Sequence, residues 1–116
     1  MKLNKKKICF DIDNVICETH NSDYKNSKPI YAAINKINKL FKKNTIILFT
    51  ARYMGRTNGS RIKSKKIGYN LTKKQLKKWG VKYHQLIMGK PSYDLIVDDL
   101  AIYFKKTWYK EIDKYL

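Results

Sequence analysis

The chain has 116 residues, of which 43% are hydrophobic and 13% aromatic, so it can bury one compact core and is too apolar for a disordered chain. Lysine and arginine number 26 against 9 acidic residues, and the formal net charge of +17 favours an anionic substrate or partner. The apolar runs are too short to cross a bilayer or to form a secretory leader, and two cysteines are too few for a disulfide framework. We therefore expect a single soluble domain over residues 1–116 in the cytoplasm, without a membrane partner.

Helical and strand-like periodicities alternate along the chain, which is typical of an α/β fold. Residues 8–10 form an apolar run that stops at Asp11, as a buried central strand would. Residues 14–28 are polar and irregular and predict a loop. Residues 29–41 predict a helix, because proline stands in the first turn and apolar residues recur at helical spacing.

The clearest strand is predicted at residues 45–50 (TIILFT), which are continuous, apolar and rich in β-branched side chains. Residues 51–60 carry two glycines and two arginines and predict a mobile loop. A second helical region follows, with Gly68 as a candidate break. Thr72 and Gln75 fit a capping box, and Gly80 is placed to end that helix.

The last third of the chain predicts more short strands and a final helix. Residues 84–88 and 95–97 are apolar strand candidates, residues 101–104 are a candidate edge strand, and residues 108–116 a terminal helix.

Four polar features fall at the ends of these predicted strands, where open α/β sheets bind ligands. They are Asp11-Ile12-Asp13-Asn14, Thr50-Ala51-Arg52, Lys90 and Asp98-Asp99. Four of the nine acidic residues thus sit in two pairs, directly behind apolar strands. Such carboxylates repel each other and lose hydration unless a cation compensates them. Each feature alone is common, but their ordered combination indicates a site.

That combination resembles the haloacid dehalogenase (HAD) superfamily of phosphohydrolases, in the segments ICFDID, IILFT, Lys90 and LIVDD. The segment GKPSYDLIVDD is similar to small capsule- and sugar-biosynthesis phosphatases of that superfamily. Asn14 stands where many relatives carry glycine, and asparagine tolerates the left-handed backbone that this turn needs. The resemblance implies a three-layer, Rossmann-like parallel sheet with helices on both faces. It implies no folded cap, because residues 14–28 and 53–70 are too short for one.

The resemblance also implies catalytic roles. Asp11 would attack phosphorus and form an aspartyl-phosphate, and Asp13 would serve as general acid and base. Mg²⁺ would bind the Asp11 side chain, the Asp13 backbone carbonyl and a carboxylate of the Asp98–Asp99 pair, with Asp99 favoured for direct contact.

Phosphate contacts would come from neighbouring groups. Thr50 would donate its hydroxyl to a phosphoryl oxygen, and Lys90 would pair with the phosphate and the nucleophile. The expected substrate-binding residues are Ile12, Ala51, Arg52 and Arg56. Arg52 would either clamp the substrate or be a solvated charge at the mouth of an open site, or of one closed by oligomerisation.

Three functions remain open at this point. The first is a Mg²⁺-dependent phosphatase acting on a small anionic phosphorylated metabolite, such as a sugar or polyol phosphate from surface-polysaccharide assembly. The second is a nucleotide or polynucleotide phosphatase, which the +17 charge and an open site favour. The third is a basic nucleic-acid-binding domain without catalysis, which lacks the sequence signatures of such modules.

Overall fold

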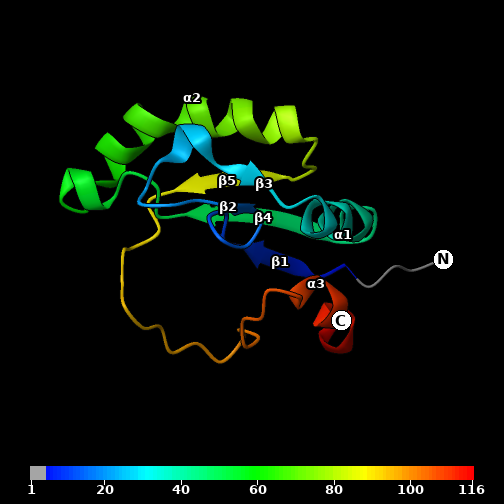
Figure 1. Ribbon diagram of the computed structural model, residues 1–116. Helices are drawn as coiled ribbons and strands as arrows, with labels where there is room; N and C mark the ends of the chain where they lie inside the picture. Colours follow the sequence, from blue (N-terminus) through cyan, green and yellow to red (C-terminus); the bar gives the residue numbers. More distant parts are fainter. Residues whose placement is uncertain (1–4) are drawn as a thin grey trace.

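The fold is built on a parallel sheet with the strand order β1-β4-β5 (Figure 1). In the computed structural model, which describes residues 5–116, the strands are β1 (Lys7–Phe10), β4 (Thr45–Thr50) and β5 (Gln85–Met88). Phe10 lies opposite Leu48, and Leu48 lies opposite Leu86. The three strands predicted in these places are confirmed, and their carboxyl ends meet at one edge of the sheet.

A small antiparallel pair follows β1 in the segment that was predicted to be a loop. It consists of β2 (Cys17–Glu18) and β3 (Lys28–Pro29), with the short 3-10 helix η1 (Tyr24–Asn26) between them. Pro29 pairs with Cys17 in this hairpin. Helix α1 (Tyr31–Phe41) therefore begins two residues later than its sequence pattern predicted.

Helix α2 (Arg61–Trp79) is a single unbroken helix. It begins at Ser60, whose side chain accepts a hydrogen bond from the N–H of Lys63, and it ends at Gly80 with φ of 73°. The end was predicted correctly. The capping box was wrong, because Thr72 lies in the middle of this helix and Ser60 supplies the actual cap.

Gly68 does not break α2 but lets another segment approach it. A Cβ atom at this position would overlap the ring of Tyr53, which follows β4. The remaining helical segments are η2 (Gly55–Thr57), α3 (Trp108–Glu111) and η3 (Ile112–Tyr115). The predicted terminal helix is thus α-helical for its first turn only.

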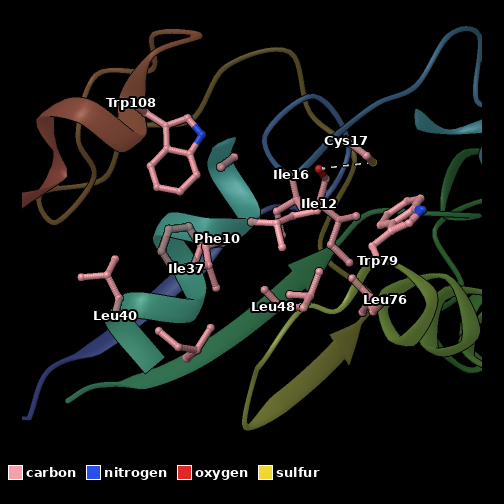
Figure 2. Packing of buried hydrophobic residues seen from close by; sticks show 14 of the residues in the cluster. Phe10, Ile12, Ile16, Cys17, Ile37, Leu40, Leu48, Leu76, Trp79 and Trp108 are labelled. Atoms are coloured by element: carbon pink, nitrogen blue, oxygen red, sulfur yellow. Dashed lines mark hydrogen bonds between the residues drawn. The ribbon is translucent and has the colours of Figure 1, made fainter. Parts of the chain in front are cut away.

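The core lies on one face of the sheet. Along β4, Ile46, Leu48 and Thr50 are fully buried, whereas Ile47 and Phe49 on the other face are partly exposed. Buried residues of α1, α2 and α3 join the first face in one apolar cluster (Figure 2). Both crossovers run in the same direction across the sheet, so right-handed connections place α1 and α2 on the same side. The second helical layer that was expected is not seen among residues 5–116.

Two predicted strands do not form. Residues 95–97 and 101–104 belong to an extended segment outside the sheet (Figure 1, yellow to orange), with Leu95 83% and Val97 94% exposed. A parallel crossover normally needs a dozen or more residues, and only residues 89–94 separate β5 from Leu95. The apolar pattern was therefore insufficient to predict a strand of this sheet at residues 95–97, because the chain before it is too short for a parallel crossover. In the part of the chain that the structure describes, no helix combines the length and apolar character of a membrane span.

Candidate active site

Three of the predicted site residues lie together at the carboxyl edge of the sheet. Asp11 follows β1, Thr50 ends β4 and Lys90 lies two residues beyond β5. The Lys90 Nζ donates to Asp11 Oδ2 at 3.1 Å, and the Lys90 backbone N–H donates to the Thr50 carbonyl at 3.0 Å. The Asp11 side chain is 36% exposed, so one carboxylate faces both a cation and solvent.

The charge of Lys90 is stabilised by its neighbours. Burial alone would lower the pKa of Lys90, but contacts with Tyr93 and Asp11 and the negative charge of Asp11 outweigh it, and the pKa lies above its ordinary value. Lys90 is therefore a firm cation beside Asp11 at neutral pH.

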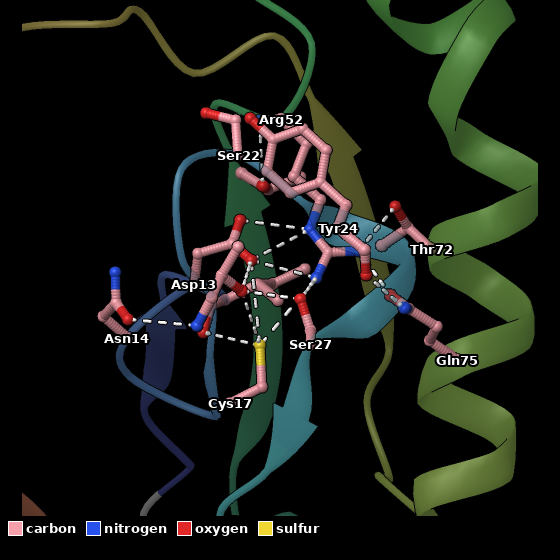
Figure 3. A network of polar contacts seen from close by, with 12 residues as sticks. Asp13, Asn14, Cys17, Ser22, Tyr24, Ser27, Arg52, Thr72 and Gln75 are labelled. Carbon is pink, nitrogen blue, oxygen red and sulfur yellow. Dashed lines mark hydrogen bonds and ion pairs between the residues drawn. The ribbon is translucent and has the colours of Figure 1, made fainter.

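Asp13 is held by Arg52 (Figure 3). The Arg52 Nε donates to Asp13 Oδ2 at 3.0 Å, and Nη2 donates to Oδ1 at 2.9 Å. Arg52 is only 1% exposed, and its Nη1 donates to Thr72 Oγ1 at 3.3 Å and Gln75 Oε1 at 2.6 Å. The interpretation of Arg52 as a solvated charge is wrong, because its guanidinium is committed to these partners in the interior.

Sequence reasoning missed Thr72 and Gln75 as supports of the site. The sequence pattern assigned both residues to the start of a helix. Two polar residues one turn apart can equally form a polar stripe on one face in the middle of a helix. The polar stripe was the available signal, since the apolar face of α2 otherwise packs on the core.

The β2–β3 hairpin supplies further contacts to Asp13 that sequence reasoning also missed. The Thr19 hydroxyl donates to Asp13 Oδ1 at 2.6 Å and lies 2.6 Å from the Ser27 hydroxyl. The Cys17 Sγ lies 3.7 Å from the same carboxylate oxygen, and burial raises the pKa of this thiol. Cys17 is thus a neutral, weak donor rather than a nucleophile.

An open cavity of about 630 Å³ extends from Asp11 and Asp13 to an aromatic mouth. The rings of Tyr24 and Tyr53 lie 4.7 Å apart there, and the Arg56 guanidinium lies 4.8 Å from the Tyr53 ring centre. Arg56 also donates to the backbone carbonyl of Ser22 at 2.8 Å.

Two other predicted substrate-binding residues, Ala51 and Ile12, differ in their position relative to this cavity. Ala51 lines it, whereas the Ile12 side chain is fully buried in the core. The Ile12 N–H donates to Asp11 Oδ1 at 2.8 Å, so in this structure the backbone of Ile12 supports the Asp11 carboxylate. Asn14 has φ of 65°, which confirms the left-handed turn expected after Asp13.

Asp98 and Asp99 do not join the other carboxylates. Both are exposed on the extended segment, and no group of three or more His, Cys, Asp or Glu side chains converges within residues 5–116. Mg²⁺ prefers an octahedron of oxygen ligands with several waters. Asp11 and the Asp13 carbonyl suit that preference, but the single chain does not bring the expected third oxygen donor to them.

Comparison with known proteins supports the fold. A crystal structure of a structural-genomics target from Vibrio cholerae is similar over 94% of this chain and 94% of its own, with a TM-score of 0.82 and 24% identical residues. No protein-family model matches the chain, and no curated protein matches it. The likeness therefore concerns the fold, a mixed α/β domain with a parallel sheet.

Proposed function

We propose that this protein is a phosphomonoester hydrolase in which Asp11 is the nucleophile. The observation that carries the proposal is the part-exposed Asp11 carboxylate, which contacts Lys90 and lines an open cavity together with Asp13. The two carboxyl groups come from one turn, and each has its own cation. In this proposal the chain is a capless member of the HAD superfamily, and residues 5–116 supply the sheet and one helical layer of that superfamily's core.

The reaction has two steps that leave Asp11 and Asp13 unchanged at the end. A carboxylate oxygen of Asp11 bonds to phosphorus, the bond to the alcohol oxygen breaks, and Asp13 gives its proton to that oxygen. Water then attacks phosphorus and passes a proton to Asp13, the bond to Asp11 breaks, and inorganic phosphate leaves.

Neighbouring residues stabilise these steps. Lys90 reduces the repulsion between the Asp11 carboxylate and a phosphate dianion, because its ammonium lies beside the carboxylate oxygen. Arg52 and Thr19 act as positioning residues, since they hold the Asp13 side chain from two elements. Mg²⁺ is the expected cofactor and would neutralise phosphate charge, held by Asp11, the Asp13 carbonyl and a third donor from outside the single chain.

The proposed substrate is a small sugar or polyol phosphate. The cavity is open and is lined by Tyr24, Tyr53 and Arg56, which supply aromatic rings and a cation for a hydroxylated, anionic molecule. A nucleotide or polynucleotide phosphate is the second candidate, because the net charge of +17 attracts polyanions.

Phosphate release from a panel of sugar phosphates, nucleotides and 3′-phosphorylated oligonucleotides, with Mg²⁺ and with excess EDTA, tests the proposal. Asp11→Asn should abolish release. Asp113→Asn is the matched control, because Asp113 pairs with Lys36 on the surface and should keep wild-type turnover. Equal turnover in both variants would refute the role of Asp11, and nucleic-acid binding without any hydrolysis would favour a binding domain.

A further inference from the structure

An apolar segment of this chain has no packing partner. Leu95, Ile96 and Val97 are 83%, 53% and 94% exposed, and Leu100 and Tyr103 are 89% and 87% exposed. The segment is extended and passes outside the sheet (Figure 1). Monomeric proteins rarely expose such a contiguous apolar run, so this segment is suited to an interface.

Strand β1 lies at an edge of the sheet and can pair with one more strand. Within residues 5–116 the strand order β1-β4-β5 makes β1 an edge strand, although it carries the candidate nucleophile at its end. Cys9 in the middle of β1 is exposed. An edge strand presents unpaired backbone N–H and C=O groups that another strand can bind.

The segment cannot fill this place from within its own chain. A strand beside β1 would lie three strand positions from β5, roughly 14 Å, and a parallel strand must also start about 13 Å back along the sheet. The chain from Met88 to Leu95 reaches roughly 25 Å when fully extended, which leaves no length to pass over the side chains of a sheet face. An antiparallel strand would be reachable, but it would carry Asp98 to the opposite end of the sheet from Asp11.

We infer that residues 94–99 of a second copy of this chain pair with β1 in parallel, and that the exchange is reciprocal. A two-fold dimer allows this, because each copy offers the same edge and the same segment. The inference deepens the proposed phosphatase site and rests on that function for its catalytic consequence.

The pairing follows from pattern and charge. With Ile96 beside Cys9, Leu95 and Val97 extend the core face of the sheet beside Ile8 and Phe10, and the two most exposed side chains of residues 95–97 become buried. Asp94 then lies beside Lys7. Residues 5–7 are all lysine, so Asp94 attracts the amino end of β1.

The exchange would complete the site. In this register Asp98 of the second copy lies beside Asp11, at the carboxyl edge of the sheet, and Asp99 follows it. Oxygen donors from two copies would then surround the Asp11 carboxylate. The carboxylates of the second copy would supply the third oxygen donor that the single chain lacks.

A disulfide tests the pairing independently of catalysis. Adjacent strands lie about 4.8 Å apart, within the Cα range of disulfides, so Ile96→Cys should form an intermolecular bond with Cys9 after oxidation with diamide. The product is a covalent dimer on a non-reducing gel. Ile62→Cys is the matched control, an exposed isoleucine of α2 that should give no such dimer. A monomeric protein in light scattering, or a disulfide within one chain, would overturn the inference.

Mixed dimers test the shared site. Asp11→Asn and the double variant Asp98→Asn, Asp99→Asn should each be inactive, whereas coexpression should restore about a quarter of wild-type activity, since half the dimers are mixed and each has one intact site. Crosslinked dimers without any phosphatase activity would refute the function but keep the exchange. An active enzyme with no rescue in mixed dimers would refute the exchange and keep the function.

Discussion

Arg52 and Asp13, which are 39 positions apart in the sequence, form a two-pronged ion pair with nitrogen–oxygen distances of 3.0 and 2.9 Å. The guanidinium is 1% exposed and ties Asp13 on the β1 side to Gln75 of α2. The pair therefore joins the candidate acid–base residue to the helical layer.

Arg52→Met should destabilise the fold by roughly 3–5 kcal/mol, because it leaves the Asp13 carboxylate and the Gln75 amide oxygen without their partner. Urea denaturation followed by circular dichroism measures this. Arg56→Met should cost less than about 1 kcal/mol, since Arg56 is exposed at the mouth. A loss of the same size in both variants would contradict the structural role of Arg52.

Lys90 should make stability depend on alkaline pH. Its pKa is raised above 10.5 in the folded protein, so its contribution is fully present below that pH and is lost as the pH rises through the folded pKa. The urea concentration at the unfolding midpoint should thus fall more steeply above about pH 10.5 in the wild-type protein than in Lys90→Met. Lys110→Met, at an exposed lysine of α3, should follow the wild-type curve, and a Lys90→Met curve parallel to wild type would contradict the pair with Asp11.

Gly68→Ala should destabilise the protein although alanine favours helices. The added methyl group meets the Tyr53 ring, and such overpacking costs about 1–3 kcal/mol. KM should also rise, because Tyr53 lines the cavity. For the loss of stability, Gly55→Ala is the control, since nothing lies within 4 Å of its added atom. Unchanged stability and KM in Gly68→Ala would show that Tyr53 does not depend on this glycine.

Salt dependence should separate the two substrate classes. A sugar phosphate meets only groups within the site, so kcat/KM should change little with ionic strength. A polynucleotide displaces several counterions, and log affinity would fall with log salt by about 0.7 per neutralised phosphate. We expect the shallow dependence, because the lysines are dispersed along the helices. A steep slope with a preference for an oligonucleotide 3′-phosphate would favour the second candidate.

The strands around the site were predictable because their signal is local. The runs that end at Asp11 and Thr50 are apolar and β-branched, and their parallel pairing follows from the helix between them. The strand at 95–97 has an equally apolar sequence, but its pairing depends on the length of chain before it, and we propose that it depends on a second copy.

The partners of Asp13 were less predictable. Thr19 and Ser27 are ordinary polar residues in a segment predicted as a loop, and no local pattern marks them. Their role arises from tertiary contacts, which bring Arg52 into the interior and require acceptors for its donors.

The central claim, covalent catalysis through Asp11, is tested most directly by trapping the phosphoenzyme. In Asp13→Asn the second step should slow by roughly 10²–10⁴-fold, whereas p-nitrophenyl phosphate needs little acid assistance in the first. The account predicts a burst of one nitrophenol per site, with phosphate found on residue 11 after acid quenching and peptide mapping. Wild-type turnover of Asp11→Asn, with no phosphate on residue 11 in any variant, would contradict it.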